Sequence, residues 1–123
     1  MKPVWTLVAF LAVAVAAMAG SSFETDIIEA DGGELEITFI GHGSLYFTYD
    51  GDVIHIDPFG RLADYGALPK ANVVFVTHHH GDHFDLDALK AVRTEDTAVV
   101  LTEVLDQILG REARSWDGED ATV

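Results

Sequence analysis

Three of the four histidines within residues 78–83, together with the aspartate there, are the side chains best suited to do chemistry. His78, His80, Asp82 and His83 form the pattern His-x-His-x-Asp-His. An imidazole pair suits zinc, and a carboxylate beside an imidazole suits a second, somewhat harder metal ion. Two such ions can share a hydroxide, lower its pKa and place it for attack on an ester, lactone, amide or phosphodiester. The pattern therefore predicts a divalent metal site of hydrolytic type.

The spacing of these residues suggests how they converge. His78 and His80 alternate along a chain that leaves a strand, so both can face one side. Asp82 and His83 are adjacent and need a tight turn to face the same pocket, for which Gly81 would provide backbone freedom. The alternative interpretation is a histidine-rich surface turn that binds metal adventitiously.

Other residues near this pattern have two interpretations each. His42 lies in a glycine turn and either approaches the pocket or is a plain turn residue. His55 is expected to be a packed histidine with one hydrogen bond, rather than a partner of the site. Asp57 ends a strand before a proline, where it either orients a ligand histidine or caps the turn. His79 is expected to be solvated.

The elements that must position these residues follow an α/β pattern. Strands are predicted at residues 34–40, 45–49, 53–56, 72–77 and 97–101, and helices at 85–92 and 102–109. The predicted order is ββββαβα, an antiparallel start that becomes strand–helix alternation. Residues 24–33 are interpreted as a polar lead-in that ends in a turn, and residues 111–123 show no clear preference.

Local signals mark several element ends. Asp50-Gly51 is typical of a hairpin turn, because glycine tolerates positive φ. Asp85 is expected to be the N-cap of the first helix. Gly110 is expected to end the second helix.

The first nineteen residues have the features of a signal peptide. Lys2 is followed by an apolar run over residues 4–17, and Ala17-Met18-Ala19 gives a small-x-small cleavage pattern. An uncleaved membrane anchor is the alternative, but the run is short for a span of roughly 20 residues. We therefore expect an exported protein, periplasmic or secreted, with residues 20–123 as one domain and no stable membrane insertion after cleavage.

Composition excludes some partners. The formal net charge is −14, with 21 acidic and 7 basic residues, and the acidic residues are spread along the chain. Such a surface argues against nucleic acid or an anionic membrane as a partner. The chain has no cysteine, so neither a disulfide nor a cysteine-linked lipid anchor is expected.

The stretch from Thr77 to His83 resembles the metal signature of the metallo-β-lactamase fold superfamily. Residues 40–44, 53–58 and 62–71 are similar to the ascorbate-6-phosphate-lactonase-like group of metal-dependent hydrolases. The similarity runs from about residue 34 to residue 110. It implies the N-terminal half of an αββα fold, in which two sheets pack together with helices outside.

The resemblance also implies roles for the site residues and their cofactor. His78 and His80 would sit in a first metal site, and Asp82 and His83 in a second. Asp82 would also orient the metal-bound water, which makes it the candidate catalytic residue for proton handling. Zinc is the expected metal, with two ions in a complete homologue, although manganese or iron would fit the same donors. The substrate would be a small molecule.

A complete member of the superfamily has a second half that supplies two further histidines and a bridging aspartate. No histidine follows His83 here, so we expect a truncated chain whose hydrolase site is incomplete. The alternative is a non-catalytic metal-binding protein. Without a second half, an exposed sheet face would favour a homo-oligomer.

Overall fold

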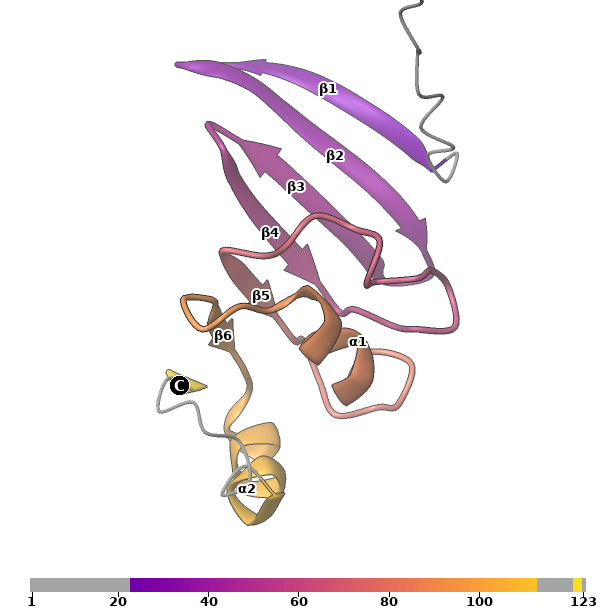
Figure 1. Cartoon of the computed structure of the whole chain (residues 1–123), viewed down its shortest axis with the longest axis vertical. Helices are drawn as coiled ribbons and strands as arrows, with labels where there is room; N and C mark the ends of the chain where they lie inside the picture. The colour runs from indigo at the N-terminus through magenta and orange to yellow at the C-terminus, as the bar shows by residue number, and fades with distance from the viewer. Residues whose placement is uncertain (1–22, 113–120, 123) are drawn as a thin grey trace, which may run out of the picture.

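A single mixed sheet organises the chain. The computed structural model describes residues 23–112 and 121–122, which form seven strands in the spatial order β1 to β7 and two helices (Figure 1). The strands are β1 Glu24–Ala30, β2 Gly33–Gly41, β3 Ser44–Tyr49, β4 Asp52–Ile56, β5 Val73–Phe75, β6 Ala98–Val100 and β7 Ala121–Thr122. The helices are α1 Leu86–Val92 and α2 Glu103–Glu112.

The first four strands form an antiparallel meander. β1 pairs with β2, β2 with β3 and β3 with β4, each through a short turn. Asp50 and Gly51 have φ angles of 50° and 86°, as a two-residue hairpin turn with left-handed residues requires. The predicted hairpin is therefore confirmed.

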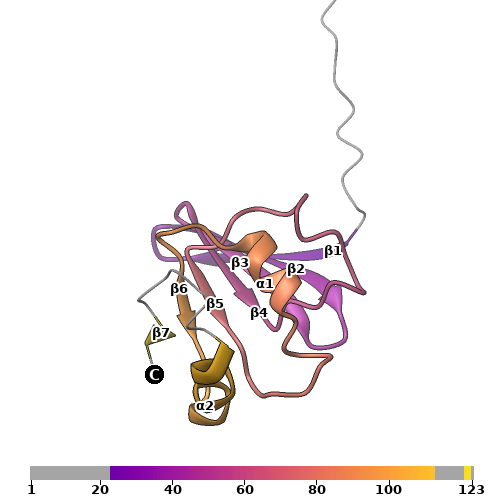
Figure 2. The same cartoon turned by 60° about the horizontal axis from the view of Figure 1, so that its bottom comes forward.

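From β4 onward the strands run parallel, because longer connections carry the chain back to the same end of the sheet. α1 provides the connection between β5 and β6. Asp85 is its N-cap, as predicted, and its carboxylate accepts hydrogen bonds from Asp87 N at 3.0 Å and Ala88 N at 3.2 Å. Figures 1 and 2 both show α2 next to β6, away from β1 and β2.

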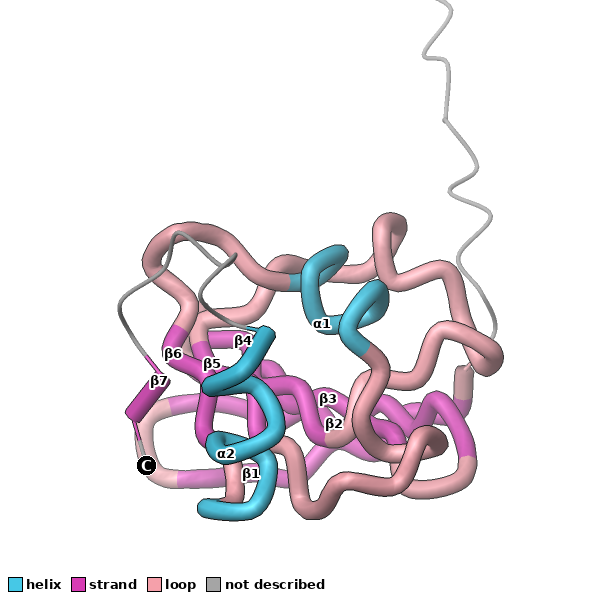
Figure 3. Tube along the Cα trace, turned by 90° about the horizontal axis from the view of Figure 1, so that it is seen from below, coloured by secondary structure: helices cyan, strands magenta, loops and turns pink. Residues whose placement is uncertain are grey.

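The hydrophobic core lies between the sheet and the helices. Leu89 and Val92 of α1 are fully buried with Val74 of β5, and Leu105 of α2 joins the same cluster. Figure 3 shows α1 against one side of the sheet. This packing holds the end of β5, and thus the histidine loop that follows it, in a defined place.

The opposite side of the sheet carries an apolar surface that we call the open face. The strand registers align two rows of apolar residues across β2 to β6, and strand alternation puts both rows on the side away from Val74. Phe39 and Phe75 on this face are each 39% exposed. The rows consist of Phe39, Leu45, Ile56, Phe75 and Val100, and of Ile37, Phe47, Ile54, Val73 and Ala98.

The structure corrects the predicted element order at both ends. β1 occupies the predicted polar lead-in, and all seven of its residues are exposed. Backbone pairing with β2 holds this strand, so it lacks the apolar alternation that would have revealed it. β7 adds a last strand beside β6, and α2 continues through Gly110 instead of ending there.

The expected signal peptide, residues 1–19, lies outside the described residues. Within residues 23–112 and 121–122, neither helix is long and apolar enough to cross a membrane.

Candidate metal centre

The loop that follows β5 carries the predicted metal ligands and closes on itself. His83 N and Phe84 N both donate to the carbonyl of His80, at 2.9 and 2.8 Å, which folds residues 80–84 into a tight turn. Gly81 lies inside this turn, but its φ is not in the left-handed region and an added Cβ would meet nothing within 4 Å. The expectation that Gly81 supplies special backbone freedom is therefore wrong, because the turn forms with ordinary backbone angles there.

Asp57 forms hydrogen bonds to several groups in and next to this loop. It follows β4, has a left-handed φ of 44° and is only 2% exposed. Its carboxylate accepts hydrogen bonds from Thr77 N at 2.7 Å, Thr77 Oγ1 at 2.6 Å and His83 Nδ1 at 2.8 Å. Ser44 Oγ donates to its carbonyl at 2.5 Å. A buried carboxylate with this many donors ties β3, β4 and the histidine loop together.

These hydrogen bonds define the tautomers of two histidines. Because the carboxylate of Asp57 only accepts, His83 must carry its proton on Nδ1. The hydroxyl of Thr77 donates its one proton to Asp57. Thr77 Oγ1 also lies 2.9 Å from Nδ1 of His78, and in that hydrogen bond it must be the acceptor, so Nδ1 carries the proton of His78. In the neutral form of each histidine Nε2 is therefore the nitrogen without a proton, through which the ring can bind a metal.

The structure brings the four predicted ligands to one place. The His78 ring centroid lies 4.7 Å from that of His80 and 4.0 Å from that of His83, and His83 Nε2 is 3.8 Å from Asp82 Oδ2. Among the described residues, two groups have donor atoms all within 4.8 Å of one another, and neither includes His80. One group is His42, Asp82 and His83, and the other is Asp57, His78 and His83.

The donor set fits a first-row divalent metal. Neutral imidazole nitrogens and carboxylate oxygens are ligands that zinc, manganese and iron accept. In the second group Asp57 already accepts from both Thr77 and His83, so its chemistry is that of a carboxylate that orients His83. The hydrogen bond that the orienting role requires is therefore present, while the role of His83 as a metal ligand stays a prediction.

His42 belongs to the site, which the sequence left open. It has a left-handed φ of 52° in the turn between β2 and β3, and its Nε2 lies 2.8 Å from Asp82 Oδ2. This hydrogen bond lowers the pKa of the Asp82 carboxyl, with smaller help from the nearby charge of His83. The sequence signal was a histidine between two glycines, but nothing local shows which distant loop it meets.

Gly43 permits the close approach of that turn to the histidine loop. A Cβ at this position would lie 2.7 Å from Cε1 and 3.0 Å from Nδ1 of His83. Contacts this short are not tolerated, so the site needs glycine here because of space. Gly43, and not Gly81, is the glycine on which the site depends.

His55 lies in the core and apart from these groups. It is fully buried, its Nε2 donates to the carbonyl of Pro69 at 3.0 Å, and its ring stacks on Tyr46 with centroids 5.1 Å apart. Burial lowers the pKa of His55, only partly offset by the hydrogen bond to Pro69. The interpretation as a packed histidine with one hydrogen bond is confirmed.

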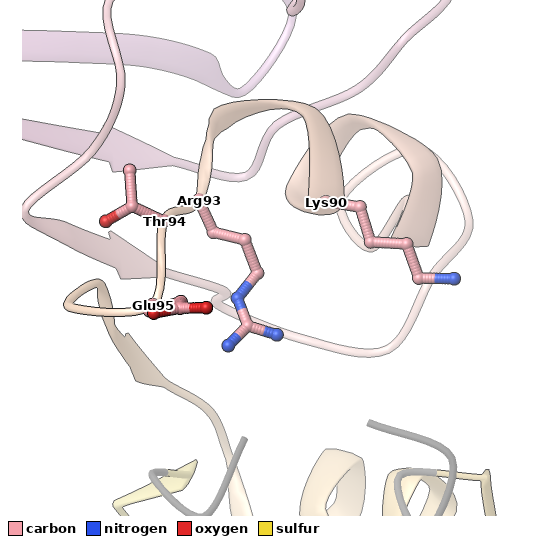
Figure 4. Close-up of a pocket in the computed structure, with 4 residues that line it drawn as sticks. All are labelled: Lys90, Arg93, Thr94 and Glu95. Carbon is pink, nitrogen blue, oxygen red and sulfur yellow. The ribbon is translucent and has the colours of Figure 1, made fainter. Parts of the chain in front are cut away.

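A separate pocket of about 370 Å³ lies at the other end of α1 from the histidine loop. Figure 4 shows its lining residues, which are Lys90, Arg93, Thr94 and Glu95. Lys90 lies in the last turn of α1 and the other three residues follow the helix, whereas the histidine loop precedes the N-cap Asp85. The pocket therefore does not contribute to the candidate metal centre.

A mixed sheet with a histidine- and aspartate-rich loop after a parallel strand is the arrangement of an α/β domain that could bind a metal. The chain belongs to the β-lactamase superfamily, because the profile of the family described as "Beta-lactamase superfamily domain" matches residues 36–120. The metallo-β-lactamase identity inferred from the signature is confirmed at the level of the superfamily.

Individual relatives agree with this assignment. The chain is 32% identical over 78 residues to a UPF0173 metal-dependent hydrolase of Staphylococcus carnosus, covering 60% of this chain and 34% of that one. It is 33% identical over 88 residues to one of Geobacillus thermodenitrificans, covering 68% and 36%. The crystal structure of a "putative metal-dependent hydrolase" from Parabacteroides distasonis matches with a TM-score of 0.69 and 45% identity, covering 72% and 40%. The chain thus spans about a third of the length of these curated relatives.

Proposed function

We propose that this chain carries the N-terminal metal-binding half of an exported, zinc-dependent hydrolase. One observation carries the proposal: hydrogen bonds to Thr77 and Asp57 occupy Nδ1 of His78 and His83 and leave Nε2 of each for a metal, and Nε2 of His83 lies 3.8 Å from Asp82 Oδ2. A site whose histidines are already in the metal-binding tautomer loses little free energy on ordering when an ion binds.

The proposed roles follow the positions of the side chains. His78 and His80 would hold a first ion, and Asp82 and His83 a second. When bound, a divalent metal would supply a Lewis acid and a water of lowered pKa. Asp82 would accept and return a proton at its carboxylate, since its side chain is 47% exposed and thus reachable by substrate. Zinc suits these donors best, and manganese or iron would also fit.

The proposed substrate is a small molecule with a lactone, ester or phosphodiester bond. The resemblance of residues 40–44, 53–58 and 62–71 to the ascorbate-6-phosphate-lactonase-like group supports a lactone or phosphorylated ester. The acidic chain, with its net charge of −14, supports neither nucleic acid nor an anionic membrane as partner.

Export is proposed from residues 1–19 alone. The basic residue, the apolar run and the small-x-small pattern support cleavage after Ala19 and a periplasmic or secreted domain. The intact mass of the natively produced protein tests this directly. A mass that corresponds to a chain beginning at Gly20 agrees with the proposal, and a mass that includes residues 1–19 contradicts it.

A second candidate function is metal binding without catalysis, in a self-associating chain. The open face supports it, because none of the ten apolar side chains in its two rows is fully buried, and Phe39 and Phe75 are each 39% exposed. The span of about a third of the curated relatives supports it too, since further ligands of a hydrolase would then come from elsewhere.

Metal content and hydrolysis measured together separate the two functions. The purified chain is loaded with zinc, dialysed, and assayed on a generic phosphodiester and a generic lactone. A second protein, expressed from the coding region extended beyond the codon for Val123, is treated in the same way. Zinc binding by both, with hydrolysis only by the longer product, agrees with the proposal of a half site. A short stop-terminated product that binds zinc without hydrolysis agrees with the second candidate, and no zinc binding by either protein contradicts both.

A further inference from the structure

The turn between β2 and β3 brings a histidine to the metal centre from outside the His-x-His-x-Asp-His pattern. His42 is forty residues from Asp82 in the sequence, yet its Nε2 lies 2.8 Å from Asp82 Oδ2. Its ring centroid is 5.0 Å from that of His83. The left-handed backbone of His42 and the missing side chain at Gly43 together allow this approach.

Two of the converging atoms already share a hydrogen bond, from His42 Nε2 to Asp82 Oδ2, which an ion bound to both would replace. His83 donates through Nδ1 to Asp57, so its Nε2 is the atom left on the side of Asp82, at 3.8 Å. In a tetrahedral zinc site with ligand bonds near 2.1 Å, neighbouring ligand atoms lie about 3.4 Å apart. The distances from Asp82 Oδ2 to the two Nε2 atoms, 2.8 and 3.8 Å, lie on either side of that value. Small rotations of exposed side chains would therefore complete the geometry.

The solvent exposure of the group also suits a metal site of catalytic type. The side chains of His42 and Asp82 are 52% and 47% exposed, while that of His83 is 18% exposed and anchored from behind by Asp57. Three protein ligands with one face open to water leave a coordination position for another molecule. The inner histidine is fixed, and the outer two ligands can adjust when the ion enters.

We propose that His42 is the third protein ligand of a metal site that Asp82 and His83 complete. This inference rests on the proposed function, because it concerns the same metal centre. It differs from a role in which His42 only donates a hydrogen bond to Asp82, since then its nitrogen would stay outside the coordination shell.

The test compares His42→Asn with wild type in the purified full chain. Asparagine tolerates the left-handed backbone at this position and is a poor zinc ligand. The control is His79→Asn, since His79 is exposed in the histidine loop after β5 and lies outside both ligand groups. Zinc affinity is measured by competition with a chromophoric chelator, and the visible spectrum is recorded with cobalt(II) in place of zinc. Urea unfolding of the metal-free proteins checks that each variant folds.

The expected result is a loss of zinc affinity greater than the ~100-fold upper end for residues that only orient a ligand. The cobalt(II) bands of His42→Asn should also change in position and intensity, while His79→Asn keeps wild-type values. A folded His42→Asn that keeps the wild-type cobalt(II) spectrum would overturn the inference and leave the proposed function standing. A wild-type chain that binds neither zinc nor cobalt would overturn both.

Discussion

At the scale of single residues, Asp57 has more influence on the site than any of the expected ligands. It sits at the end of β4, buried, and its two carboxylate oxygens receive the backbone N–H and hydroxyl of Thr77 and Nδ1–H of His83. Through these bonds it determines which nitrogen of His78 and of His83 can bind a metal. Asp57 thus holds in place the two histidines proposed as ligands, without being one of the expected ligands itself.

Asp57→Asn should lower both stability and metal affinity. The amide NH₂ that replaces one oxygen cannot accept from Thr77 Oγ1 or His83 Nδ1, and an unsatisfied buried donor costs about 1–3 kcal/mol. Zinc affinity should fall about 10–100-fold, because the tautomer and orientation of His83 are no longer held. Urea unfolding and a zinc competition titration measure the two effects.

Asp50→Asn is the matched control for this variant. Asp50 also has a left-handed φ, 50°, but it is exposed in the hairpin turn between β3 and β4. It should change the free energy of unfolding by less than about 0.5 kcal/mol. Equal effects of the two substitutions would mean that backbone conformation, and not the hydrogen bonds of Asp57, explains the loss.

Gly43→Ala should disturb the site through space alone. The new Cβ would lie 2.7 Å from Cε1 of His83, so the ring must move and its hydrogen bond to Asp57 must lengthen. We expect a cost of about 1–3 kcal/mol in the free energy of unfolding, together with weaker zinc binding. Gly81→Ala, in the loop itself, has open space for its Cβ and should behave as wild type in both measurements. If instead Gly81→Ala is the more damaging change, the assignment of the essential glycine is wrong.

At the scale of elements, α1 holds the histidine loop against the sheet. Its N-cap Asp85 accepts from Asp87 N and Ala88 N, and its second oxygen accepts from Gly60 N at 2.9 Å. One side chain therefore begins the helix and also ties it to the loop that follows β4. Leu89 and Val92 then bury the inner face of the helix on the sheet.

Asp85→Ala should destabilise the fold by about 1–2 kcal/mol, because it removes the cap of α1 and leaves Gly60 N without its acceptor. Chemical denaturation of the metal-free chain gives the value. Asp87→Ala removes an exposed carboxylate from the same first turn and should cost less than about 1 kcal/mol. If Asp85→Ala lowers the free energy of unfolding no more than Asp87→Ala does, Asp85 stabilises α1 only through its charge near the helix N-terminus and not through capping.

At the scale of the whole molecule, stability should depend on pH through His55. Its pKa in the folded chain is lowered by burial below the ordinary value of 6.5. Below that pH the unfolded chain takes up a proton that the folded chain resists. Folding stability is therefore complete above about pH 6.5 and falls as the pH decreases toward the folded pKa.

His55→Gln should remove this part of the acid sensitivity. Its amide can still donate to the carbonyl of Pro69, so the fold is expected to persist. Between pH 7 and pH 5 its free energy of unfolding should fall less steeply than that of wild type, by up to about 1.4 kcal/mol per pH unit. Urea unfolding across this range gives the slopes, and exposed His79→Gln should keep the wild-type slope. Identical slopes for wild type and His55→Gln would contradict the prediction.

The open face is the other property of the whole molecule with a measurable consequence. We expect the purified chain to self-associate through it, because Phe39 and Phe75 and their neighbours have no covering layer among the described residues. Phe39→Lys/Phe75→Lys should shift sedimentation toward the monomer. Val104→Lys, on α2 and 50% exposed, is the control and should not. A wild-type chain that stays monomeric at high concentration contradicts the expectation.

What the sequence determined by itself is the part of the protein whose causes are local. The histidine cluster, the Asp50-Gly51 hairpin and the Asp85 cap each depend on residues within a few positions of one another, so spacing and residue type were enough. β1 was not predicted, because its stability comes from pairing with β2 and its sequence shows no apolar alternation. A strand held mainly by backbone pairing has no sequence signature of that kind.

Only the tertiary structure decided which distant residues complete the site. Asp57 meets His83 across 26 positions and His42 meets Asp82 across 40, and both contacts exist because β2, β3, β4 and β5 lie side by side in the sheet. The same packing put His55 into the core and assigned the essential glycine to position 43. Local sequence specifies which groups can bind a metal, whereas strand order and burial determine which of them meet and which nitrogen each one offers.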